Sequence, residues 1–309
     1  MKRIQFHRYS GSEEMKLENY ELPSLGADEI LVRVKAASVN PVDWKIRQGA
    51  MKFMTGRKFP RGMGQDFSGV IERIGSGVKR FRVGDEVFGS TPVKTSGSFA
   101  ETLITQEKLV TKKPPTLSHE EAATLPVAGS TALIALTRRA HLKSGQKIFI
   151  NGAHGAVGRA ATQIAKMLGA SVTGRVGTHS MNDARALGMD TVLDYTQPIP
   201  KTLAGKFDAV FDAHGGLTIG EEAMLAKRGG VILDINPSPA KMLRIVFSPS
   251  HKFVMGKQNA ATLDEVGALA SKGTVKIPIG RKVGLDEGID LIRDLEAGRA
   301  KSKSVIVMG

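Results

Sequence analysis

Three glycines, Gly152, Gly155 and Gly158, recur at intervals of three residues in the segment NGAHGAVG. The preceding run, 147–151, is apolar like a buried strand, and the segment that follows repeats apolar residues at helical spacing. Glycine lets the backbone turn tightly and approach a pyrophosphate, while the N-terminus of the following helix offers free N–H groups. This arrangement predicts a dinucleotide-binding turn, to which Ala156 and Val157 also contribute. A purely structural turn is the alternative.

The next expected strand, 171–173, indicates which dinucleotide would bind. A site for NAD usually carries an acid about 20 residues beyond the turn, where it accepts a hydrogen bond from the ribose 2′-hydroxyl. Here no acid occurs before Asp183, whereas Arg175 offers a guanidinium suited to a 2′-phosphate. NADPH is therefore the expected cofactor, and an exposed arginine at a strand end is the alternative. Further contacts are expected from Gly174, Thr178 and His179.

Three more short strands are expected in the same stretch, at 191–193, 209–212 and 231–235. The carboxyl ends of parallel strands line the crevice in which such folds bind their ligands. Residues that directly follow these strands are therefore expected to border the cofactor: Tyr195, beside the adenine, and then Ala213, His214, Gly215 and Asn236.

The elements that position these residues fall into two patterns. Up to residue 118, short alternating runs are separated by glycines, which favours a small β-barrel-like domain. From Ser118, a candidate helix N-cap, helices alternate with buried strands, which predicts a doubly wound parallel sheet. The tail ends in a strand at 304–308 and is expected to rejoin the first domain. The predicted class is α/β, with one domain formed by 1–118 and 259–309 and a second by 119–258.

Composition excludes several kinds of chemistry. The 309-residue chain has no cysteine, which rules out disulfides, thiolate catalysis, iron–sulfur clusters and zinc sites with sulfur ligands. No run approaches the roughly 20 apolar residues of a membrane-spanning helix, and no apolar stretch follows the basic N-terminus. A cytoplasmic location is the expectation.

The net charge of +14 supports an alternative function. Six cations and no acid lie between Asp43 and Asp66, and a second unopposed group lies between Asp234 and Asp264: Lys241, Arg244, Lys252 and Lys257. Solvated loops would explain both windows, but a positive field also attracts anions. The alternative is a nucleotide-binding protein with a mainly structural or regulatory role, binding RNA or an anionic membrane surface.

Taken together, the chain resembles the zinc-free quinone oxidoreductases of the medium-chain dehydrogenase/reductase superfamily. The resemblance runs from the first strand to the last. Within the family, the chain is most similar to the branch of chloroplast-envelope quinone oxidoreductases and alkenal/one oxidoreductases. It is carried by ASVNPVDWKIRQG (37–49), KFPRGMGQDFSGVIERIGSGVKRFRVGDEVFG (58–89), GSFAE (97–101), LPVAGSTALIAL (125–136), ALGMDTVLDY (186–195) and GGVILD (229–234).

The resemblance implies a GroES-like catalytic domain formed by both chain ends and a Rossmann domain between them. It also implies that no metal is bound, because zinc-dependent relatives place a cysteine near 39–43 and a His-Glu pair where this chain has Gln65 and Asp66. Thr131 and Lys303, which match motif positions of the family, are expected at the cofactor.

The resemblance also places Asn40 near the nicotinamide, where its amide would donate to an acceptor oxygen. Lys45 is a candidate for stabilising an oxyanion, and Trp44 for stacking on a flat quinone. The alternatives are a turn residue, a solvated lysine and core packing, respectively. Asp43 and Asp66 are expected to be structural hydrogen-bond partners rather than acid–base catalysts.

These expectations define an enzyme, an NADPH-dependent quinone or enone oxidoreductase. Without a Lewis acid, the favoured hydride acceptors are those that delocalise negative charge themselves, namely quinones and α,β-unsaturated carbonyls. The residues do not decide between these two substrates. A homodimer is expected from the relatives, nucleic acid is not an expected partner, and contact with a membrane surface stays open.

Overall fold

The computed structural model describes residues 1–256, 258–299 and 302–309, and the chain divides into two compact units. Unit 1 comprises Met1–Val127, Gln258–Ser271 and Ile277–Gly309, and unit 2 comprises Ala128–Lys257 and Lys272–Lys276. The first boundary lies beyond the expected residue 118, because helix α3 (His119–Ala123) packs on strands β3 and β5 of unit 1.

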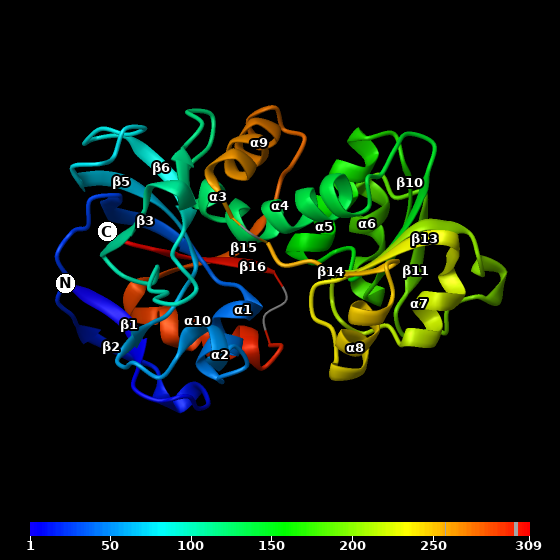
Figure 1. Cartoon of the computed structure of the whole chain (residues 1–309), viewed down its shortest axis with the longest axis horizontal. Coiled ribbons are helices and arrows are strands. Elements are labelled where there is room, and N and C mark those ends of the chain that lie inside the picture. The colour runs from blue at the N-terminus through cyan, green and yellow to red at the C-terminus, as the bar shows by residue number, and fades with distance from the viewer. Residues whose placement is uncertain (257, 300–301) are drawn as a thin grey trace. The chain divides into compact units, whose positions relative to one another are not determined.

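Unit 1 is built from two sheets (Figure 1). One has the order β2–β1–β4; the other has the order β15–β16–β3–β5–β6–β8, with β7 pairing β3. Every pair is antiparallel except β15 with β16. The strands are β1 (Lys2–Phe6), β2 (Lys16–Asn19), β3 (Glu29–Ser38), β4 (Arg61–Gly62), β5 (Asp66–Ile74), β6 (Glu86–Ser90), β7 (Thr102–Gln106), β8 (Val110–Lys112), β15 (Ile279–Gly284) and β16 (Lys303–Val307).

The last strand of the chain completes the sheet that the first residues begin. β16 pairs with β3 in the register Ile306 opposite Ala37, and both residues are fully buried. The core around them includes Ile4, Phe6 and Phe67. The helices of unit 1 are α1 (Pro41–Arg47), α2 (Lys52–Thr55), α3, α9 (Ala260–Ser271) and α10 (Gly288–Glu296), with short 3₁₀ turns at Ser12–Glu14, Glu107–Leu109 and Leu285–Glu287.

Unit 2 contains a parallel six-stranded sheet with the order β11–β10–β9–β12–β13–β14. The strand order reverses between β9 and β12, which is the point at which doubly wound folds bind ligands. The predicted doubly wound parallel sheet is confirmed. The strands are β9 (Lys147–Asn151), β10 (Ser171–Val176), β11 (Thr191–Asp194), β12 (Phe207–Asp212), β13 (Ala226–Asp234) and β14 (His251–Phe253).

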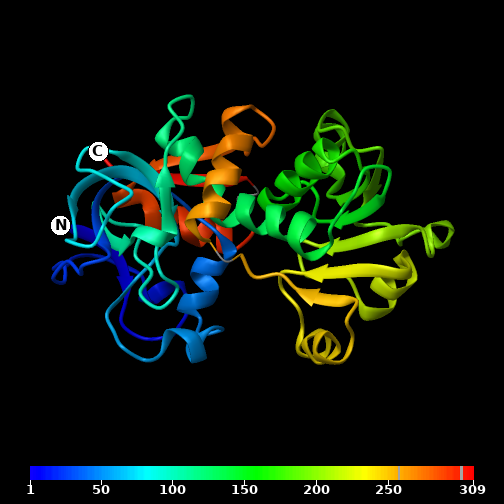
Figure 2. The ribbon, with the colours of Figure 1, turned by 45° about the horizontal axis from the view of Figure 1, so that its top comes forward.

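The helices of unit 2 include one that the sequence analysis did not expect, α8 (Pro239–Phe247), which packs beside β14 (Figure 2). Its start follows from local chemistry, because Ser238 caps the helix and Pro239 has no N–H to leave unpaired. The others are α4 (Leu125–Leu133), which begins in unit 1, a π-helical turn Ile134–Arg139, α5 (Ala156–Met167), α6 (Met181–Ala186), α7 (Ile219–Leu225) and 3₁₀ turns Thr178–Ser180 and Lys201–Leu203. Among the described residues, no helix has both the length and the apolar character needed to cross a membrane.

Candidate functional site

The glycine turn connects β9 to α5 in unit 2. Gly152 has φ +73°, a conformation that favours glycine, and Gly155 caps the N-terminus of α5, where Ala156 and Val157 form the first turn. A Cβ on Gly158 would lie 2.2 Å from the carbonyl oxygen of Gly152, so this glycine is needed for packing. A Cβ on Gly155 would meet only that same oxygen, at 3.4 Å. The backbone at Gly155 is therefore open, and the turn fits a pyrophosphate at a helix N-terminus.

Arg175 is held at the carboxyl end of β10. Its Nη2 donates to the carbonyl oxygens of Tyr195 (3.0 Å) and Gln197 (3.2 Å), while its buried Nε has no partner among the described residues. The preceding Gly174 is buried, and a Cβ there would lie 2.2 Å from the sulfur of Met189. The guanidinium is thus fixed in place and keeps donors that a phosphate can use.

The residues that follow β10 and β11 meet around one acid that the sequence analysis did not single out. Thr178 and His179 are exposed, and the ring of Tyr195 lies 3.2 Å from where a Cβ on Gly177 would stand. Hydrogen bonds from Thr178 and Thr196 lower the pKa of Asp194. The sequence shows that Asp194 follows an expected strand. However, Asp194 lies farther from the glycine turn than the roughly 20 residues at which a ribose-binding acid is expected.

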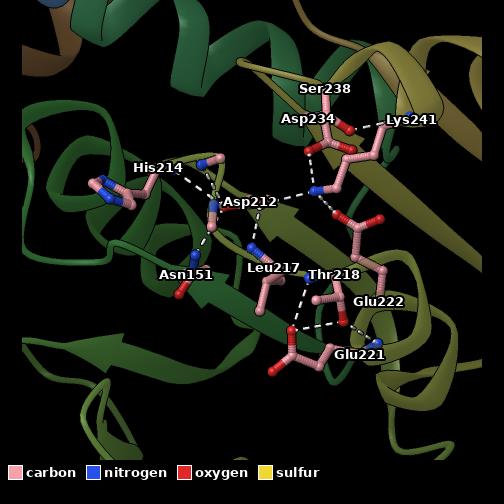
Figure 3. Close-up of polar contacts among 12 residues, drawn as sticks. Asn151, Asp212, His214, Leu217, Thr218, Glu221, Glu222, Asp234, Ser238 and Lys241 are labelled. Atoms are coloured by element: carbon pink, nitrogen blue, oxygen red, sulfur yellow. Dashed lines mark hydrogen bonds and ion pairs between the residues drawn. The ribbon is translucent and has the colours of Figure 1, made fainter.

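Asp212 organises the loop at the strand-order reversal. Its Oδ1 accepts hydrogen bonds from Asn151 Nδ2 (2.9 Å), at the end of β9, and from the Gly215 N–H (2.7 Å). Its Oδ2 accepts from the Leu217 N–H (2.9 Å). Figure 3 shows Asp212 between Asn151 and the loop that carries His214. One buried carboxylate therefore joins the ends of β9 and β12.

Five of the predicted cofactor contacts come together at this edge of the sheet. A Cβ on Gly152 would lie 2.8 Å from the Cβ of His214, and one on Gly215, whose φ is +93°, would lie 2.8 Å from Asn236 Nδ2. Ala213 precedes His214 in the same loop. The turn after β9 and the loops after β12 and β13 are therefore adjacent, as the predicted site requires.

Two of the residues expected at the cofactor do not follow a strand of this sheet. Thr131 is buried within α4. Lys303 belongs to unit 1, where its ammonium group donates to Asn40 Oδ1 (2.6 Å) and to the carbonyl oxygen of Val39 (3.2 Å). The residue as a whole is partly exposed, but burial of the ammonium lowers the pKa of Lys303. Lys303 thus joins the candidate catalytic residues.

Asn40 is the centre of a buried polar network in unit 1. Its Nδ2 donates to Asp66 Oδ2 (2.9 Å) and to the Ser38 carbonyl oxygen (3.3 Å), while its backbone N–H donates to Asp43 Oδ2 (2.7 Å). Both amide hydrogens are committed, so Asn40 would have to release one of them to donate to a substrate oxygen. Its geometry is fixed by Asp66 on one side and Lys303 on the other.

The two carboxylates of this network are deeply buried. Asp66 also accepts from the Val127 N–H (3.1 Å), whereas Asp43 Oδ1 has no partner among the described residues. Burial raises the pKa of Asp66 to about 6 and that of Asp43 to about 8, against the opposing charge of Lys303. The network therefore holds a proton near neutral pH.

The other two candidate catalytic residues follow on α1. Trp44 is partly buried and packs against the core of unit 1. Lys45 is half-buried, which lowers its pKa, and its ammonium forms no ion pair within the described part of the chain. The N–H donors of the Lys45 ammonium are therefore available to a ligand, in contrast to those of Arg47 on the same helix, which bond Glu296.

The pKa of Asp43 leads to a prediction about stability. Its pKa is higher in the folded chain than the 3.8 of an exposed aspartate, so protonated Asp43 favours the folded state. This stabilisation is complete below pH 4 and is lost as the pH rises through about 8. The free energy of unfolding should fall between pH 5 and pH 8, and Asp43→Asn should remove at least about 2 kcal/mol of that decline. Urea unfolding across this range measures it. The exposed Asp28→Asn serves as control, and parallel curves for Asp43→Asn and the unsubstituted chain would contradict the assignment.

Two family models match the chain. The model described as "Alcohol dehydrogenase GroES-like domain" matches residues 26–115, and the model described as "Zinc-binding dehydrogenase" matches residues 187–306. The first agrees with the GroES-like domain expected from the resemblance. The donors of unit 1 do not fit a zinc ion: the chain has no cysteine, and among the described residues of this unit no three His, Asp or Glu side chains lie close enough together to hold a metal.

Curated proteins and a solved structure similar to this chain carry related names. A quinone-oxidoreductase homolog of spinach chloroplasts (Spinacia oleracea) is 32% identical over 99% of this chain and 98% of its own length. The NADPH-dependent alkenal/one oxidoreductase of Arabidopsis thaliana chloroplasts is 32% identical over 99% of this chain and 79% of its own. The solved structure of a quinone oxidoreductase from Coxiella burnetii superimposes with a TM-score of 0.91 at 28% identity, covering 99% of both chains.

Proposed function

Because the chain belongs to the quinone oxidoreductase family of the medium-chain dehydrogenase/reductase superfamily, and is thus an oxidoreductase, we propose that it transfers a hydride from NADPH to a quinone or an α,β-unsaturated carbonyl without zinc. The observation that carries the proposal is the open glycine turn beside Arg175. The name of the Arabidopsis relative supports NADPH, and the names of both plant relatives support the two acceptor classes.

Each role falls to residues with the required chemistry. NADPH supplies the hydride when it is bound. The N–H groups at the start of α5 would hold its pyrophosphate, and Arg175 would bind the 2′-phosphate. Lys45, with its free ammonium, would stabilise the oxygen that gains negative charge. Acceptors that spread this charge over a conjugated system suit a site that offers ammonium groups but no set of zinc ligands.

The proposal is tested by mixing the protein anaerobically with NADPH and then with one acceptor at a time, while following absorbance of the reduced nicotinamide. A benzoquinone, a 2-alkenal and an enone should be reduced, and a saturated aldehyde should not. Activity should survive chelator treatment, with metal content measured in parallel. Binding of NADPH without turnover of any acceptor would favour the structural or regulatory alternative. Reduction of the saturated aldehyde that chelation abolishes would contradict zinc independence.

The preference for NADPH depends on Arg175. Arg175→Ala should weaken NADPH binding by about 1.5–3 kcal/mol, the range for a charge-assisted hydrogen bond, and leave NADH binding nearly unchanged. Titration by nicotinamide fluorescence measures both constants. Arg185→Ala, on the exposed surface of α6, is the matched control. Equal losses for the two cofactors would refute the 2′-phosphate role.

A cytoplasmic homodimer remains part of the proposal. Sedimentation of the purified protein tests the dimer, and fractionation of the cells that make it tests the location.

A further inference from the structure

Lys241, one of the cations in the basic window between Asp234 and Asp264, is not solvated. It lies on α8, is 4% exposed, and donates to Asp212 Oδ2 (3.0 Å), to Asp234 Oδ1 (2.9 Å) and to Glu222 Oε1. Figure 3 shows its ammonium among the three carboxylates. The Lys241 cluster, defined as these four residues, ties together α8, β12, α7 and β13.

The cluster has more negative than positive charge. Three carboxylates surround one ammonium, so full ionisation leaves two uncompensated negative charges in a buried place. Burial disfavours the charge on Lys241, but its hydrogen bonds, led by the one to Glu222, raise its pKa overall. Lys241 is therefore a fixed cation, and the proton that can come and go belongs to a carboxylate.

Burial raises the pKa of two of these carboxylates, Asp234 and Glu222. We assign the proton to Glu222. Its Oε2 is buried without a partner among the described residues, and burial raises its pKa to about 7. The charged groups that act on it are Lys241, Asp234 and Asp212. The pKa of Asp212, in contrast, is lowered, because hydrogen bonds from Asn151 and the loop N–H groups outweigh its burial.

The cluster reaches the predicted cofactor site through Asp212. One oxygen of Asp212 holds Asn151 and the Gly215 N–H, and the other holds the Leu217 N–H together with Lys241. If Lys241 were lost, Asp212 would have to satisfy the loop while buried beside two other carboxylates. Its orientation, and with it the loop at the strand-order reversal, depends on the lysine.

We propose that Lys241 is a positioning residue for the dinucleotide: acting through Asp212, it fixes the loop 213–217 that borders the nucleotide and so sets cofactor affinity. The inference rests on the proposed function, because it takes NADPH as the ligand. A role confined to anchoring α8 would alter stability alone. A positioning role also alters how tightly and at which pH the cofactor binds.

The first test compares Lys241→Met with Lys241→Arg. The methionine variant should raise the NADPH dissociation constant about tenfold, and arginine, which keeps the charge and two or more of the bonds, should restore most of the affinity. Nicotinamide fluorescence gives the constants and urea unfolding gives the stability of each variant. An unchanged dissociation constant in a folded Lys241→Met variant would overturn the proposal.

The second test does not require removal of the lysine and so survives a folding failure of Lys241→Met. Glu222→Gln keeps an acceptor for Lys241 but cannot titrate. In the unsubstituted protein, protonation of Glu222 removes one negative charge near an anionic cofactor, so NADPH should bind about three- to tenfold more tightly at pH 6 than at pH 8. Glu222→Gln should lose most of this difference.

The matched control is Glu221→Gln, one residue earlier on α7, where the partly exposed carboxylate caps the helix at Thr218 and is not part of the Lys241 cluster. It should keep the pH profile of the unsubstituted protein, whatever the 2′-phosphate itself contributes. Identical profiles for Glu222→Gln and Glu221→Gln would overturn the proton linkage. Failure of the unsubstituted protein to bind NADPH would instead refute the proposed function, which separates the two results.

Discussion

Gly158→Ala should lower the stability of the protein, whereas Gly155→Ala should weaken cofactor binding, although the two glycines are only three residues apart. At Gly158 the new methyl group would lie 2.2 Å from the Gly152 carbonyl oxygen and 2.7 Å from the Ala153 Cα, backbone atoms that cannot move aside. Alanine gains about 1 kcal/mol in helix propensity, but overpacking outweighs it. We expect a net loss of about 2–3 kcal/mol in the free energy of unfolding.

Gly155→Ala should leave the free energy of unfolding within about 1 kcal/mol, because its φ of −65° suits any residue and the methyl group would make one ordinary contact, with the Gly152 carbonyl oxygen at 3.4 Å. It should weaken NADPH binding about 5- to 150-fold, since the methyl would occupy the place of the pyrophosphate. Urea unfolding without cofactor and fluorescence titration with it separate the two effects. Normal NADPH binding by Gly155→Ala would mean that the nucleotide does not approach this turn.

Lys303→Met should be the most damaging single change in unit 1. It removes the cation from Asn40 and leaves Asp43 and Asp66 buried without a counter-charge. We expect a loss of about 3 kcal/mol in the free energy of unfolding at pH 8, because an unpaired buried charge is left behind. The loss should be smaller at pH 6, where the raised pKa of Asp43 lets it take up a proton.

The control for Lys303→Met is Lys282→Met on the neighbouring strand β15, where the ion pair with Glu120 is exposed and is expected to contribute less than about 1 kcal/mol. The double variant Lys303→Met with Asp43→Asn should recover part of the loss at pH 8. Equal losses at pH 6 and pH 8, or no recovery in the double variant, would show that the charge of Lys303 is not what stabilises this network. Turnover should fall in Lys303→Met even where the chain is folded, because Asn40 loses its fixed orientation.

The sheet of unit 2 could be predicted because its signals are local. The run 147–151 matches β9 to the residue, and the glycines after it predicted that a helix follows the turn, although not the residue at which α5 begins. The strand expected at 231–235 begins five residues earlier, at Ala226, because Ala226 pairs with Phe207 before the register shifts and resumes with Val231 opposite Ala209. Helix α8 was missed, although Ser238 followed by Pro239 is a start signal.

The candidate site was predicted where it depends on strand ends and missed where it depends on side chains from distant elements. Tyr195, His214 and Asn236 follow strands, so their neighbourhood could be inferred. Lys241 looked unopposed because the sequence places Asp212 and Glu222 29 and 19 residues away, and only the fold brings them within hydrogen-bond distance. Lys303 was assigned to the cofactor by its motif, and its bond to Asn40 arises from the pairing of β16 with β3. Lys257, in the same basic window as Lys241, lies outside the described residues.

The pairing of β16 with β3 also has a consequence for synthesis on the ribosome. Residues 36–38 of β3 pair with residues 305–307, and Val39 and Lys303, which are bonded, are 264 residues apart. At a typical elongation rate of about 5–20 residues per second, this part of β3 waits roughly 13–50 s for its partner strand. Unit 2 lies mostly within the interval and contains all six strands of its own sheet. Unit 2 can therefore complete its own sheet while β3 of unit 1 still lacks the partner strand that is translated last.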